Sequence, residues 1–192
     1  MTIHTKPEAA SDVLLFNGTL VDIQLASQAG ADRISVIRHR MPYRASPPMH
    51  VHRNEDEVFH VVEGTMRFRI GNEDIVVGAG RTVLAPKGIP HSFRVESREG
   101  ATCLTITRGD NFETMVRETG EPTSTAIMLP LQEPDAATVA ALTAACARNG
   151  IDIVGAPIVS PALPAIDEAA VEASAMRGLA LPGRDVFTLP TR

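Results

Sequence analysis

Apolar and polar positions alternate with a period of two over much of residues 12–107, which is typical of half-buried β-strands. The alternation is clearest in residues 32–41 (DRISVIRHRM) and in residues 65–70 (TMRFRI). In the second run Met66, Phe68 and Ile70 fall on one face, and Arg67 and Arg69 fall on the other. Turn signals separate the runs at residues 63–64, 71–72, 78–80 and 86–88. Short strands divided by regular turns predict an all-β sandwich or barrel.

The pattern becomes helical after residue 108. Residues 110–120 (DNFETMVRETG) predict a short helix with Gly120 at its C-terminal end. Residues 133–150 (EPDAATVAALTAACARNG) predict a longer one, with Pro134 in its first turn and Asp135 as a cap or first-turn anion.

Beyond the second helix the proline-rich residues 151–164 favour an extended conformation, and residues 166–178 predict a third helix. A segment of this size is too small to bury a core of its own. We therefore expect one β domain over residues 1–130 and a helical and extended C-terminal tail over residues 131–192, packed on the barrel or on a partner subunit.

Composition and charge narrow the class of protein. The chain has 192 residues, 44% of them hydrophobic, and a formal net charge of −5, which argues against a nucleic-acid partner. No apolar run approaches the length of a membrane span, and the N-terminus lacks the apolar region of a secretory signal. The two cysteines, Cys103 and Cys146, lie far apart in sequence and form no CxxC pair. We expect a cytoplasmic protein with reduced thiols.

Candidate chemistry is concentrated in the stretch PPMHVHRNEDEVFHVVEG. His50 and His52 are two positions apart and share a strand face, and Glu57 begins the next apolar run. His91 begins a strand after the turn at Pro86–Gly88. If these strands face each other across a barrel, three imidazoles and one carboxylate converge. That ligand set suits one divalent transition metal ion: Fe, Mn, Ni, Co, Cu or Zn.

The other polar residues near this stretch have simpler interpretations. Glu55 and Asp56 compete with Glu57 as ligands, but only Glu57 stands six residues before Gly64, so the first two are interpreted as solvated turn residues. His60 falls on the face opposite Glu57, which predicts a structural or interface role. His39, between two arginines, is interpreted as part of a solvated basic strand face.

The spacing resembles that of the cupins, whose two motifs are G-x5-H-x-H-x3,4-E-x6-G and G-x5-P-x-G-x2-H-x3-N. Residues 50–64 match the first motif, except that Arg44 stands in place of its leading glycine, and residues 80–91 match the second, whose final asparagine is Val95 here. The resemblance implies a cupin fold, a double-stranded β-helix or jelly-roll barrel, with His50, His52, Glu57 and His91 as metal ligands.

A longer likeness is to the small bacterial quercetin 2,3-dioxygenase-like cupins. It runs from residues 16–23 (FNGTLVDI) through both motifs to residues 111–122 (NFETMVRETGEP), and includes ARNGIDIVGAP in the tail. In that group a flavonol binds the metal through its hydroxylate, the glutamate takes the proton, and O2 opens the ring with release of CO. The resemblance implies that Glu57 is the catalytic base. The strand pattern suggests apolar substrate walls from residues on the ligand face, Phe59, Phe68 and Phe93.

The leading hypothesis is a metal-dependent dioxygenase acting on a flavonol or another enolisable hydroxy compound, with O2 as co-substrate. A small-molecule-binding cupin without catalysis, and a metal-dependent isomerase or lyase, remain alternatives. The apolar inward positions count against a sugar substrate. Because open sheet edges in this family are usually covered by a second copy, we also expect a homodimer.

Overall fold

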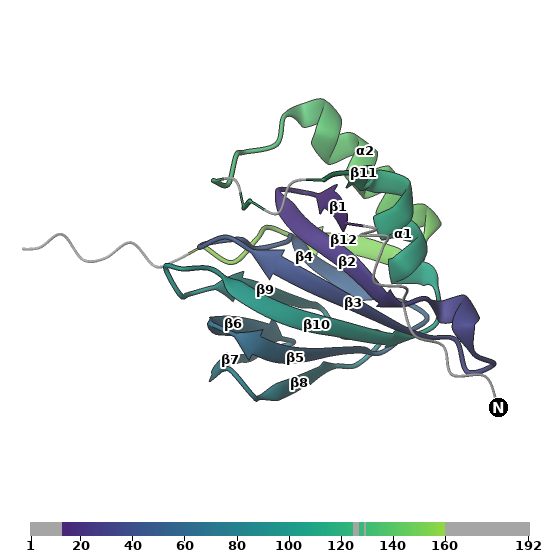
Figure 1. The fold of residues 1–192 in the computed structure, drawn as a ribbon, viewed down its shortest axis with the longest axis horizontal. Helices are drawn as coiled ribbons and strands as arrows, with labels where there is room; N and C mark the ends of the chain where they lie inside the picture. Colours follow the sequence, from purple (N-terminus) through teal and green to yellow (C-terminus); the bar gives the residue numbers. More distant parts are fainter. Residues whose placement is uncertain (1–12, 125–126, 129, 160–192) are drawn as a thin grey trace, which may run out of the picture. The chain divides into compact units, whose positions relative to one another are not determined.

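The computed structural model describes residues 13–124, 127–128 and 130–159, which fold into two antiparallel sheets joined by short turns (Figure 1). In strand order, the seven-stranded sheet consists of β11 (Glu121–Pro122), β1 (Val13–Phe16), β2 (Thr19–Leu25), β3 (Ile34–Met41), β10 (Ala101–Arg108), β5 (Glu57–Glu63) and β8 (Thr82–Ala85). The five-stranded sheet consists of β12 (Ile151–Gly155), β4 (Met49–His52), β9 (His91–Val95), β6 (Thr65–Ile70) and β7 (Glu73–Gly78). The predicted all-β fold is confirmed.

One core lies between the inner faces of the two sheets, where alternate residues of β5, β6, β8 and β10 are buried. The rings of Phe59, Phe68 and Phe93 form its aromatic centre, with centroids 5.1 Å apart for Phe59 and Phe68 and 5.7 Å apart for Phe59 and Phe93. Cys103 lies in the same core as a small apolar side chain. The period-two pattern in the sequence therefore placed these inward positions correctly.

The turn after β5 depends on Gly64. Its φ of +82° lies in the left-handed region, and a Cβ there would come within 2.5 Å of the Gly100 carbonyl oxygen. A residue with a side chain would be both strained and obstructed at this position. The glycine that fixes the count to Glu57 is thus required by the local backbone.

Two helices and one further strand cover a second core. Helix α1 spans Asn111–Thr119 and lies beside β1, and helix α2 spans Ala136–Arg148 and lies beside β12 (Figure 1). The buried apolar side chains of this second core come from β2, β3, α1, α2 and β12. Strand β12 is hydrogen-bonded to β4, the strand that carries the paired histidines.

The helix predictions hold closely within the described residues. Asp135 is the N-cap of α2, because its side chain accepts the N–H of Thr138, so Pro134 lies just before the cap and not in the first turn. The amide of Gly120 closes α1 on the Val116 carbonyl. The helix expected over residues 166–178 lies outside the described residues, and the domain boundary at residue 130 stays a prediction.

A short 3-10 turn, η1 (Ser27–Ala29), links β2 to β3. Among the residues described, none of the helices has the length and apolar character needed to cross a membrane.

Candidate metal centre

The four predicted ligands come together between the two sheets. Strand β4 places His50 and His52 on its inner face, and β9, paired with β4 at His50, brings His91 beside them. Glu57 opens β5 in the opposite sheet. One ligand atom from each of the four residues lies within 4.8 Å of all the others.

The cluster is organised around one carboxylate oxygen. Oε2 of Glu57 lies 3.0 Å from Nε2 of His91, 3.4 Å from Nε2 of His52 and 4.0 Å from Nε2 of His50. All four side chains are at least about nine-tenths buried. A buried group of three imidazole nitrogens and one carboxylate is a donor set that divalent transition metals accept.

The outer nitrogens of the imidazoles hold two of the rings in the orientation that a ligand requires. Nδ1 of His50 donates to the Pro48 carbonyl at 2.8 Å, and Nδ1 of His91 donates to the Ile89 carbonyl at 3.0 Å. These hydrogen bonds leave each Nε2 directed at the centre of the cluster. Nε2 of His52 is buried without a hydrogen-bond partner among the described residues, as expected of a nitrogen that is placed to bind a cation. The residues therefore fit a metal ion.

The charges in the cluster favour an ionised glutamate. Burial raises the pKa of Glu57, but the neighbouring His52, His91 and His50 outweigh it and lower the pKa to about 2. Burial, with His91 nearby, lowers the pKa of His50 to about 4. Burial also lowers the pKa of His52, but the Glu57 and Glu55 carboxylates outweigh it and the pKa lies above its usual value. The cluster thus carries an ionised Glu57 carboxylate, which attracts a cation.

Glu55 is a correction to the sequence interpretation, which placed it in a solvated turn. Only 2% of it is exposed. Its Oε1 accepts the backbone N–H of Phe112 at 2.7 Å and lies 3.4 Å from Nδ1 of His52. Asp56, in contrast, is exposed as expected and accepts the N–H of Lys87. The turn before β5 therefore supplies a second buried carboxylate behind the cluster.

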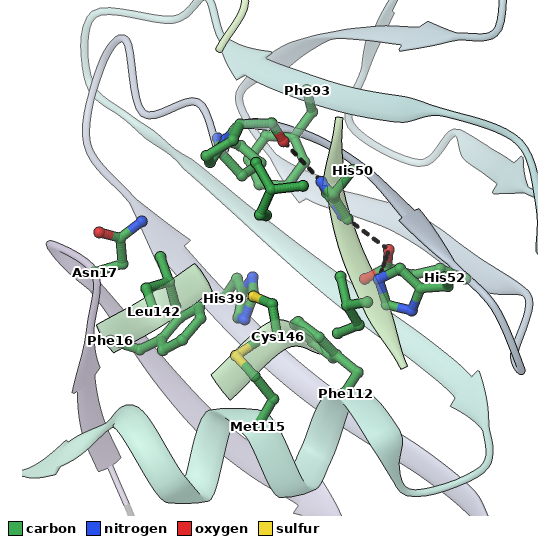
Figure 2. A pocket seen from close by; sticks show the side chains of 15 residues that line it. Phe16, Asn17, His39, His50, His52, Phe93, Phe112, Met115, Leu142 and Cys146 are labelled. Atoms are coloured by element: carbon green, nitrogen blue, oxygen red, sulfur yellow. Dashed lines mark hydrogen bonds and ion pairs between the residues drawn. The ribbon is translucent and has the colours of Figure 1, made fainter. Parts of the chain in front are cut away.

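A cavity of about 550 Å³, including the open space at its mouth, extends from the cluster toward the helices (Figure 2). Its lining is largely apolar and comes from both sheets and both helices. The residues that line it are Phe16, Asn17, His39, Pro47, Pro48, His50, His52, Glu57, Phe93, Phe112, Met115, Leu142, Cys146, Ile151 and Ile153. A largely apolar cavity with a few polar groups at defined places is the usual form of a small-molecule site.

Of the three phenylalanines expected to line the substrate cavity, one lines it and two lie in the core. Phe93 lines the cavity, whereas Phe59 and Phe68 are buried in the core between the sheets and are absent from the lining. Strand parity identifies residues that point inward but cannot say which of them reach a cavity. The remaining walls come largely from α1, α2 and β12, beyond the motifs.

His39 is the second correction. The flanking arginines predict a solvated position, but His39 is only 5% exposed and lines the cavity. The burial pattern of β3 alternates, with Ile37, His39 and Met41 inward and the arginines outward. The alternation itself was the signal that could have identified it. His60 behaves as predicted, since it faces away from the cluster and bonds Thr82.

Comparison with known proteins supports the fold. Residues 37–107 match the Cupin domain family, so the predicted all-β cupin fold is confirmed for the segment that carries the cluster. No curated protein matches the chain.

Solved structures with similar folds include a predicted oxalate decarboxylase from Thermotoga maritima (17% identity, 55% of this chain and 98% of that one, TM-score 0.49). Others are the polyketide cyclase RemF from Streptomyces resistomycificus (19% identity, 55% and 79%, TM-score 0.47) and KdgF from Halomonas sp. (16% identity, 48% and 80%, TM-score 0.43). None of these likenesses specifies a reaction for this chain.

Proposed function

We propose that this chain, whose residues 37–107 match the Cupin domain family, is a metal-dependent dioxygenase acting on an aromatic or enolisable hydroxy compound, with a flavonol as the leading substrate. The observation that carries the proposal is the position of the cluster. His50, His52 and Glu57 form one end of a largely apolar cavity that α1, α2 and β12 enclose. A metal-type donor set that opens onto apolar walls suits a substrate with one anionic oxygen on an aromatic body.

His50, His52, His91 and Glu57 would hold the metal. A divalent ion bound there supplies Lewis acidity toward a substrate hydroxylate and a centre at which O2 can react. The chain's own contribution is to fix the imidazoles of His50 and His91 through their outer nitrogens and to keep the site enclosed. The carbonyls of Pro48 and Ile89 serve the first purpose for His50 and His91.

Glu57 is the proton acceptor in this proposal. Its contacts with the three imidazoles all involve Oε2, so we assign the substrate's hydroxyl proton to Oε1. The lowered pKa keeps the carboxylate ionised throughout the physiological range. Glu57 lines the cavity, within reach of a ligand bound there.

The apolar lining supports an aromatic substrate over a sugar. Phe93, Phe112 and Met115 offer ring and thioether surfaces, and among the described residues the lining includes no lysine or arginine that would bind a phosphate or carboxylate. For a flavonol, the reaction consumes O2 and releases CO, and both atoms of O2 enter the ring-opened ester. This stoichiometry distinguishes ring cleavage from autoxidation of the phenol.

The experiment is oxygen uptake with quercetin by protein stripped of metal and reloaded separately with Mn, Fe, Co, Ni and Cu. We expect metal-dependent uptake, loss of the flavonol absorbance and release of CO in equal amount to the O2 consumed. The variant Glu57→Gln should retain bound metal and lose turnover, because it removes the base without removing the oxygen ligand. Glu63→Gln, an exposed position at the far end of β5, is the matched control and should remain active.

One result would overturn the proposal, and a second would overturn only the role of Glu57 as the base. Protein shown to hold metal that takes up no oxygen with any of the ions would favour the binding-protein or isomerase alternative. Turnover retained in Glu57→Gln would remove the base from the mechanism while leaving the dioxygenase in place.

A further inference from the structure

We propose that His39 is a second anchoring point of the cavity, which binds an uncharged polar group of the ligand at a place separate from the metal centre. The cavity would then take a flat aromatic molecule with one hydroxyl at the cluster and a further hydroxyl or carbonyl at His39. The metal end of this inference rests on the proposed function. The role proposed for His39 is argued only from the surroundings of its side chain.

His39 is enclosed by apolar groups. Figure 2 shows its imidazole among the side chains of Phe16, Leu142, Cys146 and Phe112 on the cavity wall. The ring stacks with Phe16 at a centroid distance of 6.3 Å and meets the edge of Phe112 at 5.9 Å. Its Nε2 is buried and has no hydrogen-bond partner among the residues that the structure describes. An unpaired buried nitrogen costs folding free energy, and a leucine or phenylalanine would fill this place without that cost.

The imidazole is suited to an uncharged partner. Burial lowers the pKa of His39 to about 4, with Glu57 opposing that shift, so the ring is neutral near pH 7. A neutral imidazole offers one N–H donor and one acceptor nitrogen. A phenolic hydroxyl or a carbonyl can pair with one of them, whereas a carboxylate or phosphate would find no positive charge here.

One aromatic side chain lies close to both anchors. The ring of Phe112 is 5.9 Å from the ring of His39 and also 5.9 Å from the ring of His52. His39 on β3 and His52 of the cluster thus both contact the same aromatic wall. A ligand that reaches both anchors must pass along this wall, which favours a planar aromatic body.

The test compares two probes that differ by one remote hydroxyl, 3-hydroxyflavone and 3,4′-dihydroxyflavone. Their affinities are measured by fluorescence titration of anaerobic metal-loaded protein. We expect wild type to prefer the dihydroxy probe by roughly three- to tenfold, the value of one hydrogen bond, and His39→Leu to lose this preference. His60→Leu is the control, since His60 faces away from the cavity, and it should keep the preference. His39→Leu should also unfold at an equal or higher temperature than wild type.

A second probe pair separates the two proposals. Toluene and p-cresol, followed by NMR of metal-free protein, carry no metal-binding enol and depend on the cavity only. If flavonols fail to bind wild type but p-cresol is preferred over toluene and His39→Leu abolishes that preference, the His39 anchor stands and the flavonol proposal fails. If neither pair shows a preference that depends on His39, or if His39→Leu only unfolds more easily, His39 is a structural residue and the inference is overturned.

Discussion

Glu55 connects the candidate ligand His52 to the start of helix α1. Its Oε1 lies 3.4 Å from Nδ1 of His52, which is a charge contact longer than a well-formed hydrogen bond, and accepts the N–H of Phe112 at 2.7 Å. Gly109, just before helix α1, leaves space for the Glu55 side chain, because a Cβ at residue 109 would lie 2.5 Å from Oε2 of Glu55. The position of a cavity-lining helix and the orientation of a metal ligand therefore depend on one carboxylate.

Replacement of Glu55 should weaken metal binding although Glu55 is not itself a ligand. Glu55→Gln can still accept the N–H of Phe112 but loses the charge beside His52, and we expect about a tenfold weaker metal affinity. Glu55→Ala loses both contacts and should weaken it by up to about 100-fold. Competition with a fluorescent chelator measures the affinities. Asp56→Asn, at the exposed neighbour, is the control, and equal affinities for all variants would mean that His52 needs no support from Glu55.

Loss of one ligand should be far more severe than loss of its support. His91→Ala removes a nitrogen that lies 3.0 Å from the central carboxylate oxygen, and we expect metal affinity to fall by more than about 100-fold. Native mass spectrometry of protein incubated with each ion measures occupancy. His60→Ala, which removes a histidine outside the cluster, should leave it unchanged. Full occupancy in folded His91→Ala would place the metal elsewhere.

The sequence predicted the four residues of the cluster because each stands in a short motif with fixed spacing, residues 50–64 or residues 80–91. Glu57 was selected over Glu55 by its distance to Gly64, and the backbone at Gly64 explains why that distance is fixed. The role of Glu55 was not predictable in this way, because it depends on the amide of Phe112, 57 residues later. The walls supplied by Leu142 and Ile151 depend in the same way on the packing of α2 and β12.

The position of His39 was predictable from the strand alternation, but the neighbouring arginines favoured the wrong face. Period-two alternation in residues 34–41 puts His39 on the same face as Ile37 and Met41. The flanking arginines suggested a solvated face, but Arg38 lies outward, where it pairs with Asp22 at 2.7 Å. Strand parity is determined by the backbone, and neighbouring charges on the other face do not change it.

Arg44 should be a source of strain that glycine relieves. It stands where the cupin motif has its leading glycine, and its φ is +70°. The amide of Ala45 bonds to the Pro42 carbonyl and makes Arg44 the third residue of a turn, a position where left-handed backbone favours glycine. We expect Arg44→Gly to be more stable than Arg44→Ala by about 1 kcal/mol.

The alanine variant is the appropriate reference for Arg44→Gly because both remove the guanidinium group, which lies 5.3 Å from the centre of the Tyr43 ring. Urea denaturation of the two variants measures the difference in the free energy of unfolding. Equal stability would show that the backbone at this turn relaxes without cost.

Glu113 should make the stability of the fold depend on pH in the acid range. This carboxylate on α1 is 4% exposed, accepts the N–H of Ser27 at 2.7 Å and pairs with Arg117 at 2.9 Å. Burial raises the pKa of Glu113, but the Ser27 and Arg117 contacts outweigh it, and the pKa lies below its usual value of 4.5. Because the folded pKa is the lower one, the stabilisation is fully present above about pH 4.5 and is lost as pH falls through the folded pKa.

Glu113→Gln should therefore be less stable than wild type by about 1 kcal/mol at pH 7, since a neutral amide forms weaker hydrogen bonds to Ser27 and Arg117. The difference should shrink as the pH is lowered below 4.5, where wild type becomes protonated too. Urea denaturation of metal-free protein at a series of pH values measures both effects. Glu121→Gln, at an exposed residue of β11, should show neither. A stability difference that stays constant from pH 7 to pH 3 would mean that Glu113 acts through packing and not through its charge.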